Sequence, residues 1–227
     1  MARDFIQIKR ALSDARFSSY KKQGQSDIDA LHLYLWNTML CESLYTSFQI
    51  LEVGVRNSMH LEIGNNFKDN QWLKSENAFL HPDEKTAVQT AKISLNKRNI
   101  PQNEPELVAE MSFGFWTSLL DTRYETLWHK ITAKVFPEVP RAQRTRADIS
   151  KKMNSARKLR NAAFHHHSIW HWGDLRQQHT SIRDLIRWIG PSLDEMARAV
   201  DRFPRVLRLR PKECARVSGD YILEYEI

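Results

Sequence analysis

A short segment of the chain, RKLRNAAFHHHSIWHW at residues 157–172, gathers cationic and imidazole side chains. It holds four of the nine histidines of the chain, together with Arg157, Lys158 and Arg160. Imidazole exchanges protons near neutral pH, and a guanidinium binds two phosphate oxygens while it stays charged. Three interpretations follow: a metal site, a site that cleaves phosphodiester bonds, or a solvated patch of surface.

The spacing of the histidines argues against the metal site. His165, His166 and His167 are consecutive, so on a helix they point about 100° apart and cannot all reach one ion. No cysteine lies nearby, and the chain has no HExxH pattern. We therefore expect neither a metal nor another cofactor.

Arg160 and His165 supply the side chains that metal-independent RNA cleavage requires. A base removes the 2′-hydroxyl proton, an acid protonates the leaving oxygen, and a cation stabilises charge on the phosphate. On one unbroken helix these two side chains would lie about 140° apart. They converge only if the helix ends or bends between them, or if another chain completes the site. Asn161 shares a face with His165, so its amide could orient the imidazole.

The surroundings of Arg160 leave two interpretations open. Its helical stripe is otherwise apolar, with Ile149, Met153 and Ala156. A buried arginine needs an acceptor, and an earlier segment offers one, because Glu52, Arg56 and His60 recur every four residues along one face. Such a row is typical either of an ion pair between packed helices or of an active site in the core of a bundle.

The apolar periodicity predicts an all-α protein. Apolar residues recur every three or four positions from residue 31 to residue 59, which predicts one long helix that starts at Ser26 or Asp27. Gly64 and the two asparagines after it mark its predicted end. A helix of that length needs packing partners, so we expect a bundle. Further helices are expected at residues 81–95, 106–136 with an interruption at Gly114, 147–161, and 181–203 with a break at Gly190 and Pro191.

The C-terminal end differs from the rest of the chain. Residues 214–227 alone have strand character and predict a short hairpin or an added edge. No linker stands out, so we expect a single helical domain over residues 1–227, with residues 192–227 as a basic extension. An apolar content of 41% is sufficient for a hydrophobic core.

Positive charge is concentrated in one part of the chain. Residues 141–212 contain seventeen Lys and Arg against six Asp and Glu, a net charge of +11, while the remainder has a net charge of −4. This asymmetry indicates a polyanionic partner, most simply a nucleic acid, although a solvated basic surface would have the same composition.

Several features indicate a cytoplasmic protein. The two cysteines, Cys41 and Cys214, lie far apart, which argues against a disulfide framework and suits a reducing compartment. No apolar run approaches the roughly 20 residues of a membrane span. The first residues, MARDFIQIKR, carry charges where a signal peptide would be apolar. We therefore expect no membrane partner.

The segment RKLRNAAFHH resembles the R-N-x-x-x-H signature of HEPN domains, helical bundles that often act as metal-independent ribonucleases. Other segments resemble one subgroup, the Abi-like proteins of bacteria (the AbiD and AbiF type), which are associated with abortive infection of phage-infected cells. In chain order these segments are ARFSSY, LYLWNTMLCESLYTSFQILEVGVRNSMH, MSFGFWTSLL, RKLRNAAFHHHSI and LIRWIGP. The resemblance covers residues 13–191.

The resemblance implies roles for particular residues. Arg160 and His165 match the HEPN arginine and histidine, and Asn161 matches the polar residue beside the arginine. Glu52 and Arg56 match the pattern of the long helix and would support the site. HEPN nucleases usually bring two motifs together across a dimer seam, so the resemblance implies a homodimer that completes the site.

The chain also departs from that subgroup. Where the subgroup commonly reads HHEP, this chain reads HHHS at residues 165–168, so both His165 and His166 are candidates for the catalytic imidazole. The basic residues Arg157, Lys158, Arg202, Arg205 and Arg208 are expected to contact the RNA backbone. Some members of the subgroup are associated with a small noncoding RNA, which a basic tail would suit.

Three hypotheses follow, from different classes of protein. The first is a metal-independent endoribonuclease that acts as a toxin in phage defence. The second is a non-catalytic helical module that binds RNA, for example a small noncoding RNA. The third is a structural helical module that forms dimers. RNA cleavage in the presence of EDTA separates the first from the other two.

Overall fold

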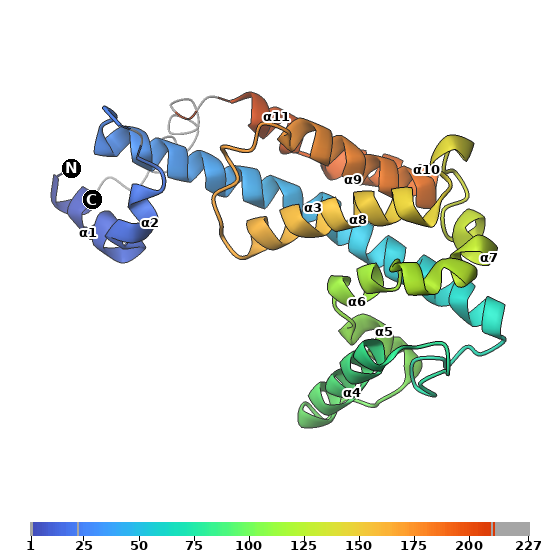
Figure 1. Cartoon of the computed structure of the whole chain (residues 1–227). Coiled ribbons are helices and arrows are strands. Elements are labelled where there is room, and N and C mark those ends of the chain that lie inside the picture. Colours follow the sequence, from blue (N-terminus) through green and yellow to red (C-terminus); the bar gives the residue numbers. More distant parts are fainter. Residues whose placement is uncertain (1, 22, 210, 212–227) are drawn as a thin grey trace. The chain divides into compact units, whose positions relative to one another are not determined.

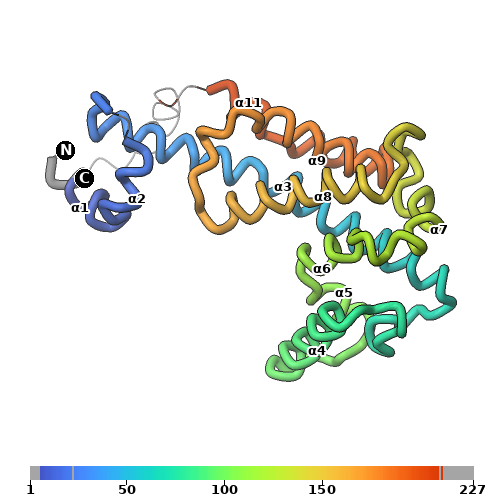
Figure 2. Tube along the Cα trace, in the orientation of Figure 1, coloured from blue at the N-terminus to red at the C-terminus, as the bar shows by residue number. Residues whose placement is uncertain are grey.

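The computed structural model describes residues 2–21, 23–209 and 211 (Figures 1 and 2). These residues form eleven α-helices, two short 3-10 helices and no strand, so the prediction of an all-α protein is confirmed. The hairpin predicted at residues 214–227 lies outside the described residues. The chain divides into two compact units, one of residues 1–46, 159–177 and 201–227, the other of residues 47–158 and 178–200.

The first unit is assembled from three separate segments of the chain. Its helices are α1 (Ala2–Leu12), α2 (Asp14–Ser18), the first part of α3 (Asp27–Phe67), the end of α8 (Arg146–Phe164) and α11 (Phe203–Arg208). A cluster of buried side chains joins α2 to α3, with Phe17, Tyr20, Ala30 and Leu33 at its centre. Trp36 and Trp170 pack against this cluster.

Helix α3 begins where the sequence predicts and ends at the residue after the predicted asparagines. The hydroxyl of Ser26 accepts a hydrogen bond from the backbone N–H of Asp29 at 3.2 Å, which caps the helix. The helix continues through Gly64 and the two asparagines that mark its predicted end, and it stops at Phe67. Lys68, with φ of 55°, adopts the left-handed conformation that stops it. A stop signal that depends on lysine instead of glycine is hard to identify in a sequence.

The second unit contains the rest of α3 and most of the remaining helices. They are α4 (Pro82–Lys97), α5 (Glu104–Glu110), α6 (Phe113–Ser118), η1 (Thr122–Tyr124), α7 (Glu125–Val135), η2 (Arg141–Gln143), most of α8, α9 (Leu175–Ile189) and α10 (Pro191–Val200). Its largest buried side chains include Trp72, Trp116, Trp128, Phe48 and Phe136. These aromatic residues provide a large part of the apolar surface that stabilises the unit.

Two breaks between helices of the second unit test the sequence predictions. The break at Gly190 and Pro191 is confirmed, because α9 ends at Ile189 and α10 begins at Pro191. The interruption predicted at Gly114 is displaced, since Gly114 lies inside α6. The break precedes it, because the hydroxyl of Ser112 caps α6 by accepting from the N–H of Phe115 at 3.2 Å.

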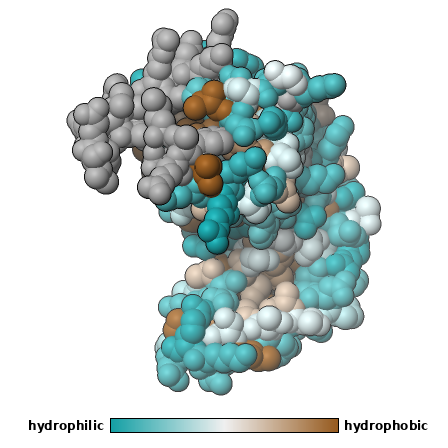
Figure 3. Space-filling view, turned by 90° about the vertical axis from the view of Figure 1, so that its left-hand side faces the viewer, coloured by the Kyte–Doolittle hydropathy of each residue, from teal (hydrophilic) through white to brown (hydrophobic). Residues whose placement is uncertain are grey.

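The described surface is largely hydrophilic on the face drawn in Figure 3, with few hydrophobic side chains visible. The large apolar side chains that are exposed include Ile6, Ile28, Tyr45, Leu61, Ile93 and Met196. Among the described helices, none combines the length and the apolar character needed to cross a membrane.

Candidate functional site

The Arg/His segment lies at the C-terminal end of α8, where the helix stops and the chain reverses. The N–H of His167 donates to the carbonyl of Ala162 at 2.8 Å, and the N–H of His166 donates to the carbonyl of Ala163 at 3.2 Å. This pair of bonds is a Schellman motif, in which the residue after the cap takes a left-handed conformation. That residue is His166, with φ of 59°. The turn therefore follows His165, whose own N–H still donates to the carbonyl of Asn161 in the helical pattern. The end of the helix does not bring the side chains of Arg160 and His165 together, and completion of the site by another chain stays a prediction.

A buried amide of α3 fixes the chain that follows this turn. Asn37 is only 4% exposed. Its side-chain oxygen accepts from the backbone N–H groups of Ile169 at 2.7 Å and Trp170 at 3.1 Å. Asn37 was not identified from the sequence, although an asparagine on the apolar stripe of a long helix indicates a polar contact, because buried amides need hydrogen-bond partners.

Arg160 lies beside aromatic side chains of the first unit. Its guanidinium carbon is 4.8 Å from the ring centroid of Phe164, which is a cation–π distance. The ring of Phe164 lies 5.7 Å from that of Tyr45 on α3. The sequence predicts that Arg160 lies on the buried stripe of its helix. In the structure the buried stripe continues through Leu159 and Ala163, and Arg160 is partly exposed. A partly exposed guanidinium is accessible to an anionic ligand.

Asn161 contacts Arg160 in the structure. Nη1 of Arg160 donates to the side-chain oxygen of Asn161 at 3.4 Å, and the backbone carbonyl of Asn161 accepts from the N–H of His165 at 2.9 Å. The amide oxygen is thus directed at the guanidinium. That orientation differs from the sequence hypothesis, in which the amide orients the imidazole of His165.

The imidazoles of His165, His166 and His167 are all exposed. The rings of His165 and His167 lie 6.4 Å apart. His166 is joined to α2, because the guanidinium of Arg16 donates to its backbone carbonyl. Arg16 was not among the sequence-predicted site residues. Arg16 and His166 are 150 positions apart in the sequence, so no local sequence pattern indicates that they are in contact.

Arg16 and His166 also border a cavity of about 420 Å³ in the first unit. Four further lining residues, His167, Ser168, His171 and Trp172, come from the chain after α8. A guanidinium and three imidazoles thus surround one depression, with the guanidinium of Arg160 on the preceding turn of α8. These groups can bind a phosphate and exchange protons near neutral pH.

Glu52 and Arg56, predicted as supporting residues, lie on the part of α3 that belongs to the second unit. Nη1 of Arg56 donates to the backbone carbonyl of Ala109 on α5 at 3.5 Å, while its Nε is buried without a hydrogen-bond partner among the described residues. The third member of the row, His60, has Nδ1 3.7 Å from Oε1 of Glu104, the first residue of α5. Arg56 and His60 thus both contact α5. These contacts agree with the interpretation of the polar row as part of the packing between helices.

His60 and Glu104 are both affected by burial. Burial lowers the pKa of His60, because a charged imidazole is poorly solvated there. Burial also raises the pKa of the Glu104 carboxyl, although that carboxylate accepts from the backbone N–H groups of Leu73 and Lys74. The histidine ring stacks on Trp72 at 5.7 Å. This neighbourhood favours a neutral imidazole.

The residues predicted to contact RNA have different surroundings. Lys158, Arg205 and Arg208 are exposed, whereas Arg157 is partly buried and donates to Asn154 at 3.1 Å. Arg202 forms an ion pair with Glu42, which compensates part of its charge. Of the predicted RNA contacts Arg202, Arg205 and Arg208, the last two, both on α11, are thus the better candidates for binding an anion.

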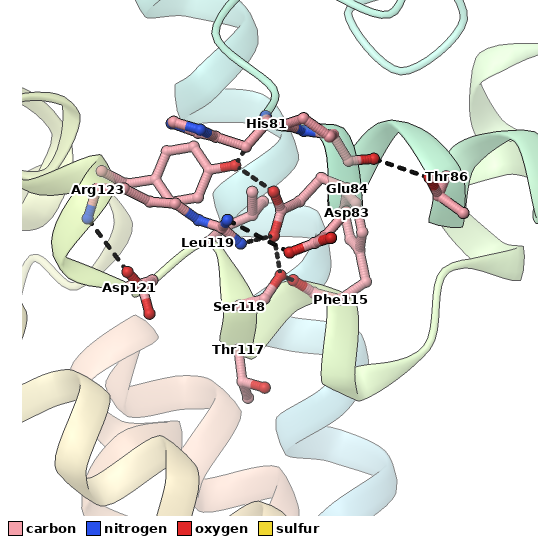
Figure 4. Close-up of polar contacts among 12 residues, drawn as sticks. His81, Asp83, Glu84, Thr86, Phe115, Thr117, Ser118, Leu119, Asp121 and Arg123 are labelled. Carbon is pink, nitrogen blue, oxygen red and sulfur yellow. Dashed lines mark hydrogen bonds and ion pairs between the residues drawn. The ribbon is translucent and has the colours of Figure 1, made fainter.

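A second polar cluster, which the sequence did not indicate, surrounds Glu84 in the second unit (Figure 4). Its carboxylate accepts from Ser118 at 2.8 Å, Arg123 at 2.6 Å and Tyr124 at 2.7 Å. Glu84 is 2% exposed and lies on α4. Burial raises the pKa of Tyr124, and the hydrogen bond to Glu84 raises it further. The buried carboxylate thus has hydrogen-bond donors on two other elements. We interpret the cluster as a structural contact that joins α4 to α6 and η1.

Among the described residues, no three His, Cys, Asp or Glu side chains lie close enough together to hold a metal ion. The prediction that the protein needs no metal stays a prediction. Comparison with known proteins gives no relative: no protein-family model, no curated protein and no solved structure matches the chain.

Proposed function

We propose that this chain is a metal-independent endoribonuclease of the HEPN type that acts in bacterial phage defence. The observation that carries the proposal is the end of α8, where the guanidiniums of Arg160 and Arg16 and the imidazoles of the following turn lie on one unit of the protein. Its basis in sequence is the R-N-x-x-x-H signature and the order of the matching segments.

In this proposal Arg160 stabilises negative charge on the phosphate that is cleaved. One imidazole, of His165 or His166, removes the proton from the 2′-hydroxyl, and a second protonates the leaving 5′-oxygen. Asn161 holds the guanidinium of Arg160 through its side-chain oxygen. The products of such a cleavage are a 2′,3′-cyclic phosphate and a 5′-hydroxyl.

The first prediction is that cleavage of RNA in EDTA depends on these side chains. Arg160→Ala should abolish cleavage, and so should either His165→Ala or His166→Ala, with losses of about 100- to 10,000-fold for a positioned acid or base. The matched controls are Arg141→Ala and His129→Ala, which remove an exposed guanidinium and an exposed imidazole of the second unit. Cleavage that survives all three site substitutions within twofold would refute the assignment.

A second prediction concerns oligomeric state. We propose that two copies associate with residues 160–165 near a twofold axis, because HEPN sites usually combine two motifs and twofold dimers are the commonest oligomers. Light scattering should give twice the mass of 26.7 kDa at the concentrations where cleavage is observed. An active monomer would contradict this part of the proposal and leave the catalytic residues unaffected.

The alternative function is a non-catalytic RNA-binding module. The net charge of +11 over residues 141–212 favours it independently of any catalytic residue. In that case the purified protein binds RNA with the usual dependence on salt but leaves it intact in EDTA. Gel analysis of the bound RNA after incubation separates the two functions.

A further inference from the structure

A second cavity of about 380 Å³ lies in the first unit and is bordered by both Arg16 and the terminal turn of α8. Side chains of α1, α2 and α3 line it, and they include Arg16, Tyr20, Tyr34, Thr38 and Cys41, together with His166. Three of these residues, Arg16, Tyr20 and His166, also line the cavity of about 420 Å³ described above. The two cavities therefore adjoin along Arg16 and the terminal turn of α8.

The walls of this second cavity are aromatic and neutral. Tyr20 and Tyr34 meet edge to face with ring centroids 5.2 Å apart. Burial raises the pKa of Tyr20 to about 12 and that of Cys41 to about 11, so both stay protonated at neutral pH. The remaining polar groups include the hydroxyl of Thr38, which is exposed. The guanidinium of Arg16 adds a positive charge at the cavity.

We propose that this cavity binds one nucleobase of single-stranded RNA while the adjoining cavity holds the neighbouring phosphate. The inference rests on the proposed function, and it identifies a single base as the part of the RNA that the site recognises. Single-stranded bases are bound by stacking on aromatic side chains and by hydrogen bonds to their edges. Tyr20 is only 2% exposed, so the partly buried ring of Tyr34 is the surface on which a base would stack. The hydroxyl of Thr38 donates to the carbonyl of Tyr34 at 3.0 Å and can accept a hydrogen bond from the base. The volume lies within the range of cavities that bind small molecules.

Arg16 links the two halves of this proposed site. A guanidinium has five N–H donors, and the contact with the carbonyl of His166 uses one of its nitrogens. Its planar fork can contact a phosphate oxygen while it holds the turn that carries the imidazoles. A base in the 380 Å³ cavity would thus fix which phosphate reaches His165 and His166.

The test fills the cavity instead of removing its walls. Ala11 lines the cavity and is exposed on α1, whereas Ala15 is exposed on α2 and does not line it. Ala11→Trp should therefore block the cavity, and Ala15→Trp is the matched control. The probe is a short RNA with 2′-O-methyl groups throughout, which cannot be cleaved through its 2′-oxygens, and a series of the same RNA that lacks one base at successive positions.

The expected result is a specific loss of binding. One abasic position in the series should weaken binding to the wild-type protein by roughly 5- to 150-fold, the contribution of stacking one base. Ala11→Trp should weaken binding of the intact RNA similarly and should bind that abasic RNA no more weakly than the wild type does. Thr38→Val, which keeps the shape of the side chain, should change the preference among the four bases at the same position.

Three results would overturn the inference. Unchanged affinity in Ala11→Trp, with a native circular dichroism spectrum, would show that no base enters the cavity. Equal losses for Ala11→Trp and Ala15→Trp would show that the tryptophan acts elsewhere. Cleavage of unmodified RNA is measured separately: binding that behaves as expected without cleavage refutes the proposed nuclease and keeps the nucleobase site, and a protein that binds no RNA refutes both.

Discussion

His166 occupies a backbone conformation that disfavours its own side chain. Its φ of 59° places it in the left-handed region, where an L-residue costs roughly 1–2 kcal/mol. Glycine is the usual residue at this position of a Schellman motif. A histidine at this position therefore lowers the stability of the fold. Strained backbone conformations of this kind are common at functional sites.

A third prediction follows from that conformation. His166→Gly should stabilise the fold by about 0.5–1 kcal/mol, because the relief of strain exceeds the entropy that glycine loses on folding. The matched control is His165→Gly, whose backbone is not left-handed and which should destabilise the protein. Urea denaturation of the two variants and the wild type measures the difference. A lower midpoint for His166→Gly would contradict this account of the turn.

At the scale of single helices, the sequence predicts much of α3, α8, α9 and α10 because their apolar residues recur with the helical period. It places the end of α3 at Gly64 and the two asparagines after it, but it does not identify Lys68 as the left-handed residue that stops the helix. The Arg/His segment was identified from residue types alone. Its partners were not, because Asn37 and Arg16 contact it across more than 130 positions of sequence. Such contacts depend on tertiary packing and leave no local pattern.

The packing of α3 against α5 gives a fourth prediction, which concerns pH. The pKa of His60 is lowered in the folded state, so below its ordinary value of 6.5 the unfolded chain takes up a proton more readily. Stability should therefore be complete above pH 6.5 and decrease as the pH falls through that value. The slope from one proton is at most about 1.4 kcal/mol per pH unit.

The variant His60→Gln isolates that effect. Glu104, whose pKa is raised, favours the folded state as the pH falls, so it acts in the opposite direction to His60. Because His60→Gln keeps Glu104, unfolding curves of this variant between pH 7.5 and 5.5 should lack the decrease that the wild type shows. If the stability of the wild type and of His60→Gln decreased equally with falling pH, His60 would not be the source of the decrease.

For the whole molecule, the uneven charge gives a fifth prediction, on RNA affinity. Arg205→Ala combined with Arg208→Ala should weaken RNA binding for all sequences and reduce the salt slope by about 1.4, since each contact to single-stranded RNA contributes about 0.7. Arg202→Ala should have a smaller effect, because Glu42 already compensates Arg202. The control pair is Lys130→Ala with Lys134→Ala, two exposed lysines of α7. If both double variants had the same salt slope, the RNA would not contact Arg205 and Arg208.

The first unit is assembled from residues 1–46, 159–177 and 201–227, and this order matters during synthesis. Trp36 donates to the carbonyl of Val206, a contact that spans 170 residues. At about 5–20 residues per second, a ribosome needs roughly 10–30 s to proceed from one partner to the other. Throughout that interval the nascent chain lacks the parts that complete the unit carrying Arg16, Arg160 and the imidazoles. If the proposed nuclease function holds, the unit that carries its site cannot be completed before the ribosome has added Val206.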